Sequence, residues 1–344
     1  MPENITIVGG GLAGLTLGIG LRRLGVPVTV WEAGAYPRHR VCGEFISGDG
    51  QNSLARFGLL DGLHSAGTSS ANSVAFFAWP TKVLQRPLPD AALCISRFEL
   101  DQWLAREFQR LGGELRQGVR WCGKFEEGIV RASGRRAEPV TDGWRLFGLK
   151  VHARDVAMDA DLEMHFVPSG YVGLCKLANG AVNICGLFRS QTTVPVLAQR
   201  WRDWLRGPAA SALRSRLAAA HFEEDSFCSV AGLCLRPLCA TQRNECCVGD
   251  ALTMIPPVTG NGMSMAFETA ELAMDPLANF SRGNVTWARA TQEIASRCDE
   301  RFTARLRWAA WLQRALFQPH ARSVLMFLAA RSEWLWRGMF ERTR

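Results

Sequence analysis

Three glycines near the N-terminus are spaced as in a nucleotide-binding turn. Gly9, Gly11 and Gly14 fill the pattern G-x-G-x-x-G. The first glycine of such a pattern permits a tight turn, the second lets the backbone approach a pyrophosphate, and the third lets a helix pack closely on a strand. Leu12 and Ala13 begin the helix that follows, where unpaired N–H groups and the helix dipole favour an anion. The pattern predicts that this turn binds the phosphates of a dinucleotide.

A carboxylate follows at the separation that such a site requires. Residues 5–8 and 28–32 are β-branched runs separated by a stretch of helical length, so together they indicate one strand-helix-strand unit. Glu32 ends the second run, 23 residues after Gly9, close to the roughly 20 expected for an acid that accepts a hydrogen bond from a ribose hydroxyl. Because an anion here would repel a 2′-phosphate, the unit favours FAD or NAD over NADP.

A second helix mouth of the same kind lies near residue 250. Asp250 ends a short apolar run, and Gly260, Gly262 and Met263 open a stretch of helical period. Glycines at the start of a helix again leave N–H groups open to an anion. Asp250 is therefore expected to accept hydrogen bonds from sugar hydroxyls, while the helix dipole would stabilise negative charge on a reduced flavin.

The connection over residues 33–48 is long and rich in turn formers and cations. It contains Arg40, Cys42 and Gly43. Long loops in compact domains are usually functional, and this one suits a segment that wraps over a flavin or a phosphate. Cys42 is either a redox thiol or, because it has no C-x-x-C partner, a residue that packs beside the cofactor.

The hydrophobic periodicity predicts further elements that alternate between helix and strand. Helices are expected over 53–60, 95–111, 194–220 with a break at Gly207-Pro208, and 259–274, and strands over 73–88, 114–121, 128–135, 144–188, 227–237 and 245–251, with a hairpin turn at Asn179-Gly180.

Composition indicates a folded globular chain. Its 344 residues are 47% hydrophobic and 21% charged, which excludes a disordered protein and allows about two domains. The eleven cysteines include no C-x-x-C pair, a spacing that fits neither a zinc site nor a disulfide framework. Reduced thiols, an N-terminus without the features of a signal peptide, and the lack of an apolar run of ~18 residues lead us to expect a cytoplasmic protein.

The positive charge is concentrated at the C-terminus. Residues 284–344 contain eleven arginines, five acidic residues and five tryptophans, a net charge of +6 out of +8 for the chain. Arginine and tryptophan on helices are typical of a peripheral contact with a membrane. The same composition also suits a helix pair that closes a substrate domain, and both interpretations stay open.

Taken together, these motifs resemble those of the FAD-dependent oxidoreductases of the p-hydroxybenzoate hydroxylase fold and, within them, the geranylgeranyl reductase-like group. The resemblance spans residues 1 to about 280 and rests on Gly9 to Gly14 with Glu32, Arg40 to Glu44, Ser96-Arg97 with Asp101, Gly249-Asp250, and Pro256 to Met263. It implies that Gly9, Gly11, Gly14 and Glu32 hold the ADP half of FAD, that Arg97 and a strand near Trp121 flank the cofactor, and that Asp250, Gly262 and Met263 hold the ribityl chain and the ring.

The fold class that follows is α/β, with α+β character. We expect a Rossmann-type FAD-binding domain assembled from residues 1–72, 89–135 and 238–283. A substrate domain built on a β-sheet would take residues 73–88 and 136–237, and residues 284–344 would form a C-terminal helical segment.

The expected activity is flavin-mediated reduction of a double bond, or monooxygenation, of an apolar small molecule that is lipid-like or polyketide-like. NAD(P)H is the expected external electron donor, and no nucleic acid is expected as a partner. One alternative is a flavin-binding redox sensor without turnover. Another is a halogenase-like enzyme, although the Trp-x-Trp-x-Ile-Pro motif of flavin halogenases is absent.

Two further side chains attract attention in the predicted substrate sheet. Lys150 and His152 alternate along one strand, so both would point to the same side of the sheet. Either they face a substrate cavity, or they belong to a solvated face.

Overall fold

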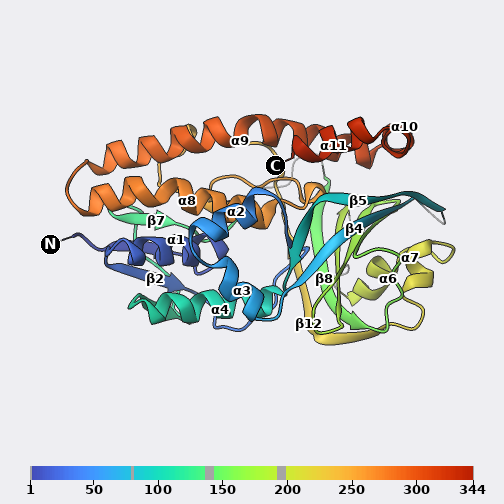
Figure 1. Ribbon diagram of the computed structural model, residues 1–344, viewed down its shortest axis with the longest axis horizontal. Coiled ribbons are helices and arrows are strands. Elements are labelled where there is room, and N and C mark those ends of the chain that lie inside the picture. The colour runs from blue at the N-terminus through green and yellow to red at the C-terminus, as the bar shows by residue number, and fades with distance from the viewer. Residues whose placement is uncertain (1, 79–80, 136–142, 192–198, 344) are drawn as a thin grey trace.

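The computed structural model describes residues 2–78, 81–135, 143–191 and 199–343. Two sheets lie side by side, and a layer of C-terminal helices covers both of them (Figure 1). The mixed α/β class predicted from the sequence is confirmed.

The first sheet has four parallel strands in the order β6-β2-β1-β7. Parallel strands bring their carboxyl ends to one edge, where open α/β sheets bind their ligands. Helix α1 (Leu12–Arg23) connects the first two strands, and α4 (Arg97–Arg110) and α8 (Gly262–Ser281) pack against it. The strands are β1 (Ile5–Val8), β2 (Val28–Glu32), β6 (Glu114–Gln117) and β7 (Ile129–Arg131).

The second sheet has eight strands, mostly antiparallel, in the order β12-β8-β11-β10-β9-β4-β5-β3. The predicted hairpin at Asn179-Gly180 joins β10 to β11, with Gly180 at φ +79°. The strands are β3 (Phe45–Ile46), β4 (Ser69–Ala78), β5 (Thr81–Cys94), β8 (Arg145–Arg154), β9 (Leu162–Val167), β10 (Gly170–Lys176), β11 (Val182–Ser190) and β12 (His221–Ala231).

This sheet is covered on both faces because its strands alternate apolar side chains between them. On β10, Val172 and Leu174 belong to the cluster that packs on α6 (Trp201–Arg206) and α7 (Ala212–Arg216), whereas Tyr171 and Cys175 belong to the cluster on the opposite face. The glycine-proline break predicted between two helices lies between α6 and α7, and residues 194–198 of that predicted stretch lie outside the described residues.

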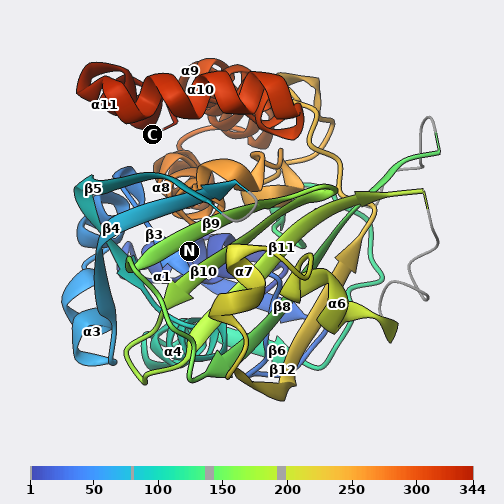
Figure 2. The same ribbon diagram turned by 90° about the vertical axis from the view of Figure 1, so that its right-hand side faces the viewer.

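The C-terminal helices form the layer above both sheets (Figures 1 and 2). Helix α9 (Trp287–Phe317) is 31 residues long, ~46 Å at helical rise. Its first half packs on α8 through Ile294 and Phe302, and its end joins α10 (Pro319–Arg331) and α11 (Glu333–Glu341) over the second sheet. In the part of the chain that the structure describes, no helix is long and apolar enough to cross a bilayer.

Several predicted elements differ in extent. Strand β6 ends at Gln117 because Gly118, at φ +74°, turns the chain, so Trp121 lies in a loop and not in a strand. The predicted strand 245–251 is reduced to a single bridge between Cys247 and Arg131, after which Gly249, at φ +61°, leads into a 3-10 turn. The strand predicted at 227–237 instead occupies His221–Ala231.

The first half of the chain also divides differently between the sheets. Strand β4 begins before the predicted range 73–88, and strand β5 ends after it. Strand β3 lies inside the range assigned to the FAD-binding domain, yet it pairs with β5 in the second sheet. Two short helices, α2 (Asp49–Arg56) and α3 (Leu60–Ser65), replace the one expected over 53–60.

Removal of residues 322–344 tests the role of the last two helices. Met326, Ala329, Trp336 and Met339 are buried in the cluster on the second sheet, so the truncated protein would expose a contiguous apolar surface and should aggregate. Light scattering of the purified protein measures this directly. A monodisperse truncated protein with the melting temperature of the full chain would contradict it.

Candidate functional site

A cavity of about 1180 Å³ lies where the carboxyl edge of the first sheet meets the second sheet and the C-terminal helices. Of the fifteen residues predicted to bind the cofactor, all line this cavity except Gly14. They are Gly9, Gly11, Leu12, Ala13, Glu32, Arg40, Cys42, Gly43, Arg97, Trp121, Asp250, Gly260, Gly262 and Met263. The structure thus brings together residues that lie more than 250 positions apart in the sequence.

The three glycines of the N-terminal turn have three different surroundings. Gly9 has φ +118°, and a side chain there would overlap the carbonyl oxygen of Ala132. A Cβ on Gly11 would meet nothing within 4 Å, so this position opens into the cavity. Gly14 does not line the cavity: a Cβ there would overlap the carbonyl oxygen of Gly9, so this residue permits the close packing of α1 that the pattern predicts for its third glycine.

Glu32 is held firmly at the end of β2. Its carboxylate accepts hydrogen bonds from the backbone N–H groups of Gly10 (2.9 Å) and Gly34 (2.8 Å) and forms an ion pair with Arg38 at 2.6 Å. Burial alone would raise the pKa of Glu32, but these hydrogen bonds and the charges of Arg38 and Arg40 hold it below the usual range. Glu32 is therefore an anion that also fixes the glycine turn.

Two donors beside this turn have no partner within the described residues. The Nε atoms of Arg40 and the indole Nε1 of Trp121 are buried without a hydrogen bond, although both residues line the cavity. Trp121 packs edge-on against Trp31, with ring centroids 5.1 Å apart. Both residues line the cavity, so acceptors on a bound ligand would satisfy these two donors.

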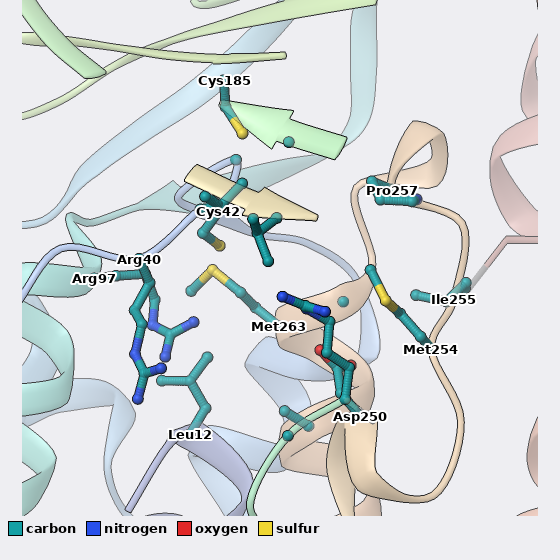
Figure 3. Close-up of a pocket in the computed structure, with 18 of the residues that line it drawn as sticks. Leu12, Arg40, Cys42, Arg97, Cys185, Asp250, Met254, Ile255, Pro257 and Met263 are labelled. Atoms are coloured by element: carbon teal, nitrogen blue, oxygen red, sulfur yellow. The ribbon is translucent and has the colours of Figure 1, made fainter. Parts of the chain in front are cut away.

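The second helix mouth lies across the cavity from the first. Gly260 adopts the left-handed conformation at φ +68°, and a Cβ on Gly262, the first residue of α8, would meet nothing within 4 Å. Asp250 points into the cavity (Figure 3). Its carboxyl is reached from the cavity yet enclosed by protein, and this burial raises its pKa to about 6 against the opposing charges of Arg97 and Arg135.

Arg97 and Cys42 lie next to each other on the cavity wall (Figure 3). The Arg97 guanidinium donates to both carboxylate oxygens of Asp101, at 2.7 and 2.8 Å, so it is fixed in place at the start of α4. Burial raises the pKa of Cys42 despite the nearby guanidinium. Since the thiolate is the reactive form of cysteine, the structure favours the packing role of Cys42 over the redox role.

A charge cluster lies at the cavity wall, and we call it the Glu44 cluster: Glu44, Lys150, His152 and His39. Glu44 and His39 line the cavity, and Lys150 and His152 lie on β8 beside them. Glu44 Oε2 lies 2.6 Å from His152 Nε2, and Glu44 Oε1 lies 3.3 Å from Lys150 Nζ. Lys150 Nζ also donates to His39 Nδ1 at 3.0 Å. Lys150 is 0% exposed and His152 is 4% exposed, so the prediction of a solvated strand face is wrong.

Burial and the neighbouring charges of the Glu44 cluster shift the pKa values of its members. Burial and the charges of Lys150 and His152 lower the pKa of His39 to about 4, so its ring is neutral and accepts from the ammonium group. Burial alone would raise the pKa of Glu44, but the hydrogen bond from His152 and the charge of Lys150 hold it below the usual range. Glu44 itself has φ +62°, a conformation that costs a non-glycine residue roughly 1–3 kcal/mol.

Comparison with known proteins finds a family match in the first part of the chain. Residues 3–135 match the family described as FAD binding domain. A curated relative, conditioned medium factor receptor 1 of Dictyostelium discoideum, is 26% identical over 128 residues, which are 34% of this chain and 25% of that protein. The chain thus matches only a quarter of the length of this relative.

Solved structures match nearly the whole chain. The flavin-dependent brominase Bmp2 has a TM-score of 0.75 at 15% identity, covering 99% of this chain and 93% of that one. The p-nitrophenol 4-monooxygenase PnpA from Pseudomonas putida has a TM-score of 0.75 at 16% identity, covering 99% and 98%. These likenesses establish the fold, which is that of flavin-dependent monooxygenases and halogenases, and confirm the predicted p-hydroxybenzoate hydroxylase fold.

The cavity fits the FAD that this domain implies. Two helix mouths open into it at Gly11 and Gly262, where a side chain would occupy free space. The unpartnered donors of Arg40 and Trp121 lie on the side of the first helix mouth, and the carboxyl of Asp250 on the side of the second. A dinucleotide with phosphates in the middle and hydroxyls on either side matches this order of groups.

The sequence missed several residues of the site. Arg38, which pairs with Glu32, lay in the predicted loop but carried no spacing signal. The Tyr36 hydroxyl donates to the carbonyl of Gly10, and Ser133-Gly134 of the loop after β7 also lines the cavity. A search for cations and turn residues within one loop of the glycine pattern would have found the first two.

Glu44→Gln tests the buried cluster. The substitution leaves the Lys150 ammonium buried without its anion, so the free energy of unfolding should fall by about 3–5 kcal/mol. Because the pKa of Glu44 is lowered in the folded state, its contribution is complete above its unfolded pKa of about 4.5 and is lost as the pH falls through its lower folded pKa. Urea unfolding at pH 7 and at acidic pH measures both effects.

Glu99→Gln is the matched control, since Glu99 is an exposed glutamate near the cluster. It should change stability by no more than about 0.5 kcal/mol. A loss as small as this for Glu44→Gln would show that the cluster carries little of the stability.

Proposed function

We propose that this protein is an FAD-dependent monooxygenase that acts on an apolar small molecule. The observation that carries the proposal is that the cavity does not end at the cofactor-binding residues. It continues into an apolar chamber between the second sheet and α9–α11, lined among others by Phe76, Leu162, Met164, Leu316, Met326 and Trp336. The p-nitrophenol 4-monooxygenase PnpA shares this fold.

In this proposal the two helix mouths share one FAD. Gly9, Gly11 and Arg40 hold the pyrophosphate, and Glu32 accepts from the adenosine ribose. Trp121 lies beside the adenosine half. These assignments are supported by the open space at the glycine and by the unpartnered donors on the cavity wall.

The other half of FAD would lie between Asp250 and the start of α8. Asp250 accepts from ribityl hydroxyls, while Gly260, Gly262 and Met263 hold the ring, and Gly43 lines the same cavity. Cys42 and Arg97 lie across the cavity from Asp250 (Figure 3). When bound, FAD supplies two-electron redox chemistry and the reaction with oxygen.

The residues of the chamber exclude water from the reaction. Cys185 and Cys228 line the cavity as thiols, and burial raises the pKa of both, that of Cys228 to about 12. The one phenol on the chamber wall, Tyr171, has its pKa raised by burial and stays protonated. Its hydroxyl, 3.5 Å from Gln313 Oε1, is a polar group able to orient a substrate.

NAD(P)H is the electron donor we propose. A second cavity of about 390 Å³ adjoins the first at Leu233, which lines both. Four arginines line it, Arg145, Arg189, Arg236 and Arg314, and no described acidic side chain does. Such a site suits the phosphates of a pyridine dinucleotide.

Double-bond reduction is the second candidate, since the likeness of Arg40 to Glu44 to geranylgeranyl reductases favours it. The brominase Bmp2 shares the fold, but the halogenase motif is missing from the sequence. A redox sensor without turnover would use the same FAD site. The reaction products distinguish a monooxygenase, a reductase, a halogenase and a sensor without turnover.

The decisive experiment supplies the purified yellow protein with NADH or NADPH and a panel of apolar phenols and lipids under oxygen-18. A monooxygenase consumes oxygen and places one labelled atom in the product. A product that gains two hydrogens without oxygen would make the protein a reductase, and a brominated product in bromide buffer would make it a halogenase. Reduction of FAD without turnover of any compound would favour the sensor.

Gly173→Phe in the same assay tests the chamber. Gly173 lies on β10 between Tyr171 and Cys175, and a Cβ there would meet only two backbone oxygens, at 3.6 and 3.9 Å. A phenyl ring would therefore fill the chamber, and kcat/KM should fall by about tenfold or more while FAD stays bound. Gly173→Ala is the control and should retain most of the activity. Equal activity of both variants would place the substrate elsewhere.

The raised pKa of Asp250 predicts how FAD binding depends on pH. Its carboxylate accepts from hydroxyls, so protonation as the pH falls below about 6 should weaken binding by up to tenfold per pH unit. Asp250→Asn should bind FAD more weakly by about 1–3 kcal/mol and should lose this dependence. Fluorescence titration of the apoprotein with FAD measures both, and a wild-type affinity that stays constant from about pH 7 to pH 5 would contradict the assignment.

A further inference from the structure

The outer side of α10 is apolar. Val324, Phe327 and Leu328 are 60%, 54% and 46% exposed. Together with Arg331 they follow the spacing i, i+3, i+4, i+7, which places all four on one side of a helix. Trp334, the second residue of α11, is 81% exposed. We call these five residues the outer stripe.

The outer stripe is unusual for this molecule. Of the seven large hydrophobic side chains that are exposed in the described residues, four fall within residues 324–334. Helices α9, α10 and α11 form one outer edge of the molecule, at the top of Figure 2. Exposed apolar groups gathered in this way mark a contact surface.

We propose that the outer stripe docks on the surface of a lipid bilayer that contains anionic lipids. The stripe combines two aromatic residues and two aliphatic residues with one arginine, and such a side of a helix lies in the headgroup region with its apolar groups among the acyl chains. The indole of Trp334 and the guanidinium of Arg331 both tolerate that region.

The charge around the stripe complements anionic headgroups. Residues 319–337, which contain the outer stripe, include three arginines, Arg322, Arg331 and Arg337, and one acidic residue, Glu333. Glu333 pairs with Arg337, with its Oε1 3.0 Å from Arg337 Nε. Arg331 remains exposed, with its guanidinium 3.6 Å from the centroid of the Phe327 ring. A peripheral contact that combines apolar insertion with basic residues holds more firmly than either alone.

A second copy of the chain fits this surface less well. The four apolar side chains of the stripe expose on the order of 500 Å² between them, which is less than the about 800 Å² per partner of a standard interface. A like-charged partner would also bring its own Arg331 to the same surface. Both arguments favour lipid over a dimer.

Docking here would give an apolar substrate a dry route into the chamber. Met326 on the inner side of α10, and Trp336 and Met339 on α11, line the cavity, so the helices that touch the bilayer also form the wall of the chamber. This step rests on the proposed function, whereas docking itself does not.

Vesicle flotation of the FAD-loaded protein tests the docking without any turnover. The probes are vesicles of phosphatidylcholine alone and of equal parts phosphatidylcholine and phosphatidylglycerol. The protein should float with the anionic vesicles and less with the neutral ones, and raising the salt from about 0.1 M to 1 M should weaken flotation as the Debye length falls from ~10 to ~3 Å.

Variants then assign the contact to the stripe. Leu328→Ser should lower the vesicle partition coefficient about tenfold, and Phe327→Ser with Leu328→Ser should lower it about a hundredfold, since each apolar side chain withdrawn from lipid costs about a power of ten. Arg331→Glu should reduce flotation with anionic vesicles and leave flotation with neutral vesicles unchanged. Val119→Ser is the matched control, because Val119 is 45% exposed against 46% for Leu328, and it should float as the wild type does.

Failure takes distinct forms. A wild-type protein that floats with neither vesicle overturns the inference, as does equal flotation of Leu328→Ser and Val119→Ser. A dimer by light scattering that Phe327→Ser with Leu328→Ser converts to a monomer, together with no flotation, would assign the stripe to a second copy instead. The flavin absorbance and melting temperature of each variant show that it is folded, and none of these outcomes depends on the monooxygenase assay.

Discussion

The two sheets of the molecule are joined at the side chain and backbone of one residue, Glu44. Its carboxylate accepts from the backbone N–H of Arg97, at the start of α4, and pairs with Lys150 and His152 on β8 of the second sheet. Its carbonyl accepts from Ile95 N–H at 3.1 Å. These contacts of the side chain and the backbone hold Glu44 in its left-handed conformation despite the strain.

This anchor fixes the cofactor loop between the sheets. Cys42 and Gly43 precede Glu44 directly, and the Cys42 carbonyl accepts from Asn183 Nδ2 of β11 at 2.9 Å. The loop that lines the cavity is therefore tied to both sides at once. The carboxylate, the ammonium and the histidines satisfy one another where the loop meets β8, so the buried charges of this cluster are paired, as buried charges require.

Local patterns predicted the parts of the site that are local in the sequence. The glycine turn, Glu32 and the mouth of α8 were found because each is defined by spacing within one strand-turn-helix unit, where backbone geometry dictates residue type. Lys150 and His152 were found as a pair but misread, because their partner Glu44 lies more than a hundred residues away. Gly14 was given both roles, because spacing alone does not separate a glycine that faces a phosphate from one that permits helix packing.

The predicted ends of strands were wrong where a single glycine turns the chain. Gly118 and Gly249 both take positive φ values, and each ends an extended run that the apolar pattern would have continued. A sequence shows that a glycine is present but not whether its freedom is used, since Gly11 and Gly173, with negative or extended φ, serve instead to leave space in the cavity.

Net charge was the least reliable of the sequence signals. The +6 of residues 284–344 counts Arg301 and Arg305, yet these pair with Asp49 and Glu268 and hold α9 on α8 and α2. The arginines of this segment therefore include some that pair inside the protein and some that face outward, and a charge count does not distinguish the two kinds. What separates them is position around the helix: α10 turns Met326 and Ala329 inward and Phe327 and Leu328 outward. A helix with two apolar sides needs two apolar neighbours, one of which is the second sheet, and the inferred bilayer surface supplies the other.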